Sequence, residues 1–149
     1  YLPRPAGPAG DEEARKRHAL LATAQQQGVR AMASVWVQGM VHPERLTDAA
    51  LIDTIVQMFE RKTADTFERQ IRALLHRPDA TEVLRQLRIP TLVLCGAQDS
   101  WSPVAQHQAM ADLIPPPWQH MAVIPEAGHM CTMERPEAVA AALVDWLHT

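Results

Sequence analysis

The sequence has few cysteines, no long apolar run and no strong excess of either charge, and each absence excludes a class of protein. Its two cysteines, Cys95 and Cys131, are 36 positions apart and form no C-x-x-C motif, so neither a zinc ribbon nor a thioredoxin-type site is expected. Both lie in apolar surroundings, which is typical of buried, inert thiols. No apolar stretch approaches the roughly 20 residues of a membrane span. A net charge of -3 is too small to indicate a nucleic-acid or membrane-surface partner.

The overall composition is typical of one packed domain. The chain has 149 residues, of which 47% are hydrophobic and 21% are charged, so a sizeable core is expected. Residue 1 is Tyr, and residues 1–10 are rich in Pro, Gly and Ala, which predicts a loop or linker and suggests a fragment or a processed chain. Two thiols without a secretory-signal pattern favour a cytoplasmic location.

Residues 11–86 carry only helical patterns. A helix is predicted over 11–27, with Gly28 as its C-cap. Apolar residues at helical spacing predict a second helix over 29–40. Three further helices are expected from their N-capping residues, which are Thr47, Thr63 and Asp79.

The pattern changes to alternating strands and helices after residue 89. Thr91–Cys95 is apolar on both faces, which is typical of a strand in a covered parallel sheet, and Met121–Ile124 predicts a second strand. A helix is expected between them over 103–113, and Pro136 occupies a first helical position before the final helix. The order predicts a β-loop-α-β-loop-α unit whose two strands are parallel.

Two ionisable residues follow these strands. Asp99 comes three residues after Gly96, and His129 comes directly after Gly128. Ligands of open α/β sheets bind outside the carboxyl ends of the strands, and neighbouring parallel strands end at the same edge. A carboxylate beside an imidazole there fixes the imidazole tautomer and leaves the other ring nitrogen to take a proton from a nucleophile. The spacing therefore predicts the acid and base of a hydrolytic triad.

Three segments resemble the α/β-hydrolase fold family. Ile89–Asp99 resembles the strand-and-acid segment of that family, Ile124–His129 its histidine segment, and Glu134–Val139 the Glu-x-Pro stretch that follows the histidine. Residues 11–78 are similar in type to the helical cap inserted before the last two strands, and within the family they are most like the cap of 3-oxoadipate enol-lactonase and related lactonases and esterases. The resemblance implies an α/β fold in which a cap is followed by the C-terminal part of the core over 79–149.

The chain departs from the family pattern in one large respect. The fold places its nucleophilic serine in a G-x-S-x-G elbow before the acid and the histidine, and no such motif is present. The serines are Ser34, Ser100 and Ser102. The resemblance therefore implies the cap and C-terminal half of a hydrolase, inactive alone, whose partners are the missing N-terminal half of the core and a small ester, thioester or lactone substrate. It implies no metal and no organic cofactor. A two-stranded sheet has exposed edges, so homo-oligomers are expected if the fragment folds alone.

Several alternatives remain at this stage. Trp101 and Met130 flank the proposed catalytic residues, so they either line a substrate pocket or serve only packing. Trp36 belongs to an apolar stripe that indicates either the core of the cap or the roof of the pocket. The fold also hosts dehalogenases and carbon–carbon bond hydrolases. A non-catalytic binding or dimerising module is the alternative from another class, and it predicts that the Asp99 carboxylate lies beyond hydrogen-bond reach of the His129 imidazole.

Overall fold

The computed structural model describes residues 8–149, which form two compact units. The first unit comprises residues 8–38 and 49–79, and the second comprises residues 39–48 and 80–149. Most of the expected N-terminal loop, residues 1–7, lies outside the described residues. Residues 8–10 already belong to the first helix, so the loop predicted over 1–10 is wrong at its end.

The first unit is built from helices. They are α1 (Pro8–Gln27), α2 (Val29–Trp36), α3 (Ala49–Glu60) and α4 (Ala64–Leu75). A buried cluster joins three of them and contains Ala24, Met32, Phe67 and Ile71. Trp36 packs between two phenylalanines, with ring centroids 5.2 Å from Phe59 and 5.3 Å from Phe67. Aromatic pairs at this distance add stability beyond their buried area.

Local chemistry explains where these helices begin and end. Gly28 separates α1 from α2 with φ 89°, a left-handed conformation that glycine adopts without steric cost. Thr63 caps α4, because its hydroxyl accepts a hydrogen bond from the Thr66 amide at 3.1 Å. The prediction that Thr47 caps α3 is wrong. Thr47 ends the 3₁₀ helix η2 (Pro43–Thr47) and donates its hydroxyl to the Glu44 carbonyl, so α3 begins two residues later.

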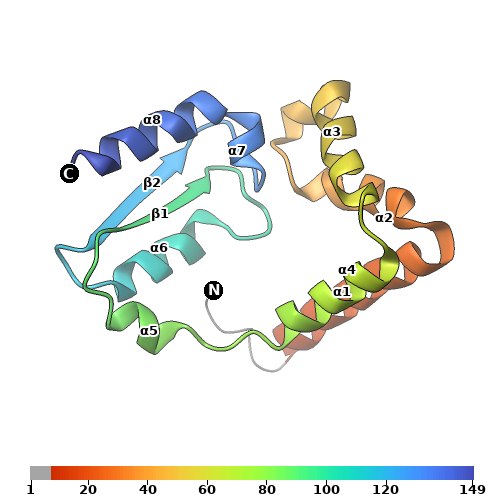
Figure 1. The fold of residues 1–149 in the computed structure, drawn as a ribbon, viewed down its shortest axis with the longest axis horizontal. Helices are drawn as coiled ribbons and strands as arrows, with labels where there is room; N and C mark the ends of the chain where they lie inside the picture. Colours follow the sequence, from red (N-terminus) through yellow and green to blue (C-terminus); the bar gives the residue numbers. More distant parts are fainter. Residues whose placement is uncertain (1–7) are drawn as a thin grey trace. The chain divides into compact units, whose positions relative to one another are not determined.

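The second unit contains the sheet. Its elements after residue 80 are α5 (Thr81–Arg85), β1 (Thr91–Gly96), α6 (Val104–Leu113), β2 (Gln119–Ile124), α7 (Cys131–Glu134) and α8 (Pro136–Leu147). The strands are parallel, as predicted, and their register runs from Thr91 opposite Gln119 to Gly96 opposite Ile124. The sheet lies between α6 and α8 (Figure 1). The pattern did not predict α7, and the N-cap of α5 is Ala80 rather than Asp79.

A buried cluster fills the space between β2 and the last helices. It contains Ile124, Ala127, Cys131 and Val139. Gly96 is also confined, because a Cβ atom there would lie 2.2 Å from the Gly128 carbonyl oxygen and 2.4 Å from that of Ala127. The end of β1 therefore lies in direct contact with the loop that follows β2, and only glycine fits.

Residues 39–48 were expected within the helical cap, but they belong to the second unit. The predicted helix over 29–40 ends at Trp36, and the 3₁₀ helix η1 (Val37–Gly39) follows it. The chain then bonds to the loops of the second unit: Ser100 donates its hydroxyl to the Gly39 carbonyl at 3.0 Å, and the Met130 amide donates to the Met40 carbonyl at 2.9 Å. These contacts join residues far apart in sequence, which periodicity does not reveal.

Candidate active site

Asp99 and His129 lie on the loops that follow the two parallel strands. Gly96 ends β1 opposite Ile124, which ends β2, so the two loops start side by side. Gln98 ties the loops together, because its amide donates to the Ala127 carbonyl at 2.9 Å and its side-chain oxygen accepts from the Ala127 amide at 3.2 Å. The backbone thus brings the two loops together independently of the ionisable side chains.

The two side chains form a hydrogen bond. Asp99 Oδ2 lies 2.8 Å from His129 Nδ1. Asp99 is 6% exposed, and its other oxygen, Oδ1, accepts from the amides of Trp101 and Ser102, both at 2.9 Å. Three donors therefore fix a buried carboxylate in one orientation, which offsets the cost of removing it from water.

This arrangement defines the roles of the two imidazole nitrogens. An ionised carboxylate only accepts hydrogen bonds, so His129 Nδ1 carries the proton and donates it to Asp99. Nε2 is then the acceptor nitrogen of the neutral ring. The His129 side chain is 40% exposed, in contrast to the 4% exposed side chain of Asp99. The pair can therefore take up a proton at Nε2 while the buried carboxylate stabilises the resulting charge.

Trp101 contacts the imidazole. Its ring centroid lies 5.0 Å from that of His129, with the planes inclined by 43°. The indole lies against Gly39, where a Cβ atom would come within 2.5 Å of Trp101 Nε1. Met130 is partly buried and follows His129 directly, while Trp36 lies in the first unit against Phe59 and Phe67. Substrate binding by Trp101, Met130 and Trp36 stays a prediction.

Sequence reasoning missed the structural importance of Glu134 and of the segment that it contacts. Glu134 is 3% exposed, and its carboxylate accepts from the His42 amide at 2.6 Å and from the Gly128 amide at 2.8 Å. The sequence signal was the Glu-x-Pro stretch, which gave no role to the glutamate. Met40 and His42 carry no signal, because both act through their backbone.

The two cysteines are free and buried. Burial raises the pKa of both thiols, and the negative charge of Asp99 raises the pKa of Cys95 further. The thiolate is the nucleophilic form of cysteine, and a raised pKa lowers the fraction of thiolate at neutral pH. Neither thiol has the environment of a catalytic cysteine.

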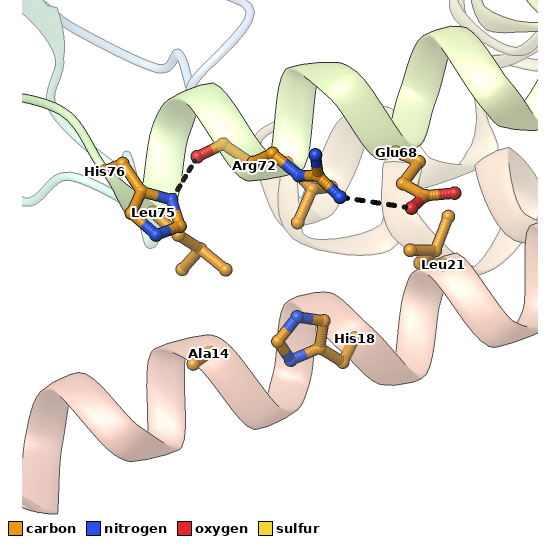
Figure 2. Close-up of a pocket in the computed structure, with 8 residues that line it drawn as sticks. Ala14, His18, Leu21, Glu68, Arg72, Leu75 and His76 are labelled. Atoms are coloured by element: carbon orange, nitrogen blue, oxygen red, sulfur yellow. Dashed lines mark hydrogen bonds and ion pairs between the residues drawn. The ribbon is translucent and has the colours of Figure 1, made fainter.

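Two hollows in the described part of the chain are lined by residues other than Asp99 and His129. One, of about 280 Å³, lies between α1 and α4, with His18 on α1, Arg72 on α4 and His76 directly after α4 (Figure 2). The other, of about 260 Å³, is lined by β2 and α8 residues that include His120 and Trp146. Within residues 8–149 no group of three or more His, Cys, Asp or Glu side chains could hold a metal ion. None of the helices over the same residues is long and apolar enough to span a membrane.

Most of the sequence also matches a known protein family. The alpha/beta hydrolase family model matches residues 3–142. The chain belongs to this family. The resemblance predicted from the three sequence segments is therefore confirmed, and so is the α/β fold class.

Solved structures support the same fold. A thermophilic esterase from Thermogutta terrifontis, solved with malate bound, is 31% identical, with a TM-score of 0.82 over 97% of this chain and 52% of its own. The enol-lactonase of Burkholderia xenovorans LB400 is 18% identical, with a TM-score of 0.75 over 91% of this chain and 51% of its own, and at that identity it shows the fold alone. This chain thus spans about half the length of each solved hydrolase.

One curated relative gives a shorter match. The 2-hydroxy-6-oxo-6-(2'-aminophenyl)hexa-2,4-dienoic acid hydrolase of Metapseudomonas resinovorans is 36% identical over 66 residues, which are 44% of this chain and 22% of the relative. The names of the esterase, the lactonase and this relative all describe hydrolases.

Proposed function

We propose that this chain supplies the acid and base of a serine-type hydrolase that acts on an ester, thioester or lactone carbonyl. The observation that carries the proposal is the 2.8 Å contact between Asp99 Oδ2 and His129 Nδ1 at the ends of two neighbouring parallel strands. Family membership supports it, as does the likeness to an esterase that is 31% identical.

In this mechanism His129 acts first as a general base and then as a general acid. Its Nε2 accepts the proton of the serine hydroxyl as the serine oxygen attacks the carbonyl carbon. The same nitrogen returns the proton to the leaving alcohol or thiol when the carbonyl–heteroatom bond breaks, which leaves an acyl-enzyme. A water molecule then repeats the two proton transfers and releases the acid. Asp99 stays ionised throughout, and it orients His129 and stabilises its protonated form.

The nucleophile has to come from outside these 149 residues. Each serine hydroxyl already donates a hydrogen bond within this chain: Ser34 to the Arg30 carbonyl, Ser100 to the Gly39 carbonyl, and Ser102 to the Gln106 side chain. None of the three lies in a G-x-S-x-G elbow. The donors that stabilise the oxyanion have to come from the same source, because this fold takes one of them from the residue after the nucleophile.

We propose the N-terminal half of a hydrolase core as the partner of this chain. The sheet of the second unit has two strands, and such small sheets are marginal in water unless more strands or helices cover them. Apolar side chains on β2 and α8 are exposed, namely Val123, Leu143, Val144 and Leu147. Further strands would cover the open edges. Homo-oligomers through the same edges are the expected result when the fragment is alone.

Substitution of His129 tests the function. The chain would be joined to, or co-expressed with, a nucleophile-bearing half, and the hydrolysis of a short aryl ester would be followed. Without its base, His129→Ala should lose at least about 100-fold in kcat. His18→Ala, which changes an exposed histidine in the first unit, is the matched control and should keep full turnover. Unchanged turnover in His129→Ala would remove this residue from the mechanism.

Hydrolysis of a carbon–carbon bond is the second candidate. It is favoured by the match over 66 residues to the hexadienoic acid hydrolase. Comparing turnover of an aryl ester with that of such a dienoic acid, on the same assembled enzyme, distinguishes the two. The non-catalytic module is disfavoured, since it required the Asp99 carboxylate to lie beyond hydrogen-bond reach of His129, and the distance is 2.8 Å.

A further inference from the structure

Glu134 bridges the backbone of the His129 loop and the backbone at His42. Its Oε1 accepts from the amide of His42, 92 positions earlier in the chain, at 2.6 Å. Its Oε2 accepts from the amide of Gly128 at 2.8 Å, and Gly128 directly precedes His129. Both carboxylate oxygens are thus used, and each bond to a charged acceptor is stronger than one between neutral groups.

The residue after His129 is held by the same segment. The Met130 amide donates to the Met40 carbonyl at 2.9 Å. The backbone of residues 40–42 also lies directly against Gly128, where a Cβ atom would come within 2.6 Å of the Val41 carbonyl carbon and 2.8 Å of the His42 nitrogen. Both neighbours of His129 are therefore anchored to residues 40–42, one of them through the Glu134 carboxylate.

The importance of this anchorage follows from the geometry of the site. Asp99 is fixed by the amides of Trp101 and Ser102 on its own loop. The His129 side chain is more exposed than that of Asp99, so fewer contacts hold the ring and its position depends more on how its backbone is held. A catalytic group has to be held within about 0.5 Å of its productive position. The placement of His129 thus depends on contacts outside its own loop.

We propose that Glu134 is a positioning residue for His129. It acts through the amides of Gly128 and His42 and contacts neither the imidazole nor a substrate. Removing one of its two bonds lets the loop before His129 move away from residues 40–42, so the imidazole spends less time bonded to Asp99. The effect on turnover rests on the proposed function, whereas the effect on the Asp99–His129 bond does not.

Glu134→Gln tests this assignment with little change of shape. The amide oxygen still accepts one backbone N–H, but the amide nitrogen is a donor and faces the other N–H, so one of the two bonds is lost. Glu137→Gln, an exposed position in the first turn of α8, is the matched control. The readouts are the proton resonance of His129 Nδ1–H in this chain, and kcat and KM in the assembled enzyme.

We expect Glu134→Gln to keep its far-UV circular dichroism while its Nδ1–H resonance broadens or exchanges at least ~10-fold faster with water. We expect kcat to fall ~10- to 100-fold, with KM within ~3-fold of the parent value, because misplacement of a catalytic group affects the chemical step. Glu137→Gln should match the parent protein in all three. A Glu134→Gln protein with the parental resonance and kcat would overturn the assignment.

A second measurement needs no variant and decides the matter if Glu134→Gln fails to fold. In the unmodified chain the amides of His42 and Gly128 should exchange at least ~100-fold more slowly than in the unfolded chain, since both are bonded to a buried carboxylate. Fast exchange at either amide would refute the bridge. Loss of the resonance in Glu134→Gln alongside full turnover in His129→Ala would support the bridge and overturn the proposed function, so the two failures are distinguishable.

Discussion

Replacing Asp99 by asparagine changes the imidazole tautomer while keeping the shape of the loop. The asparagine oxygen can accept from the Trp101 and Ser102 amides as Oδ1 now does, at 2.9 Å each. Its NH₂ group then occupies the place of Oδ2, 2.8 Å from His129 Nδ1, and donates where the carboxylate accepted. The ring responds by placing its proton on Nε2, so that nitrogen no longer accepts the proton of the nucleophile.

The size of the effect follows from the loss of the acceptor nitrogen. With the base in the wrong tautomer, kcat of the assembled hydrolase should fall about 10⁴-fold, or about 5 kcal/mol in activation free energy. The free energy of unfolding should change by less than about 1.5 kcal/mol, because the loop bonds persist. Asp99→Ala leaves the Trp101 and Ser102 amides without their acceptor, and it should cost about 3 kcal/mol of stability as well as activity.

The assay combines aryl-ester turnover with urea unfolding of Asp99→Asn and Asp99→Ala. The His129 Nδ1–H resonance should also vanish in Asp99→Asn, which reports the tautomer independently of turnover. Two results contradict the reasoning: kcat within about 10-fold of the parent in Asp99→Asn, or equal loss of stability in both variants.

Three further predictions concern the scaffold. Gly96→Ala should lower the free energy of unfolding by ~3 kcal/mol or more, because its Cβ atom would meet the backbone carbonyl of Gly128 at 2.2 Å, as urea unfolding will measure. Cys95 and Cys131 should react with a disulfide reagent at pH 8 at least ~100-fold more slowly in the folded chain than in urea, because burial raises the pKa of both thiols. Burial opposes ionisation of Glu13, but two bonded arginines outweigh it and lower its pKa, so this contribution to stability is present at neutral pH and is lost as pH falls below the ordinary glutamate value of 4.5.

Each of these has a matched control or a contrary outcome. Gly28→Ala has open space around its Cβ atom but a backbone at φ 89° and ψ 160° that strains any side chain, so it should cost about 1–3 kcal/mol, less than Gly96→Ala. Equal thiol reactivity in folded and unfolded chains would show that the cysteines are accessible. Glu13→Gln should flatten the acid limb of the stability profile, and a profile identical to that of the parent would remove Glu13 and its bonds to Arg17 and Arg77 from the balance.

The sequence predicted the features that local pattern and strand direction determine. The two strands, their parallel pairing and the meeting of Asp99 with His129 follow from apolar runs and from the common edge at which parallel strands end. The N-cap at Thr63 was also predicted, because a hydroxyl accepts from an amide only three residues away.

The remaining features depend on contacts between distant backbone groups. Residues 39–48 follow an apolar helical stripe, and nothing in their side chains indicates that the Met40 carbonyl and the His42 amide bond to the loop around His129. Glu134 could be noticed as an acid beside a proline, but its burial becomes evident only when residues 92 positions apart are brought together. Trp36 is a different case. A large apolar side chain at helical spacing fits either a helical core or the wall of a pocket, so the sequence pattern cannot choose between them.

The division of the chain into interleaved segments has a consequence for synthesis. The polypeptide passes between the two units three times, at residues 38/39, 48/49 and 79/80. Residues 39–48 leave the ribosome long before Glu134 exists, and at about 5–20 residues per second that interval lasts about 5–20 s. During this time the early segment has no acceptor for the His42 amide, so a nascent chain stalled before residue 134 should be unusually sensitive to proteases near residues 40–48.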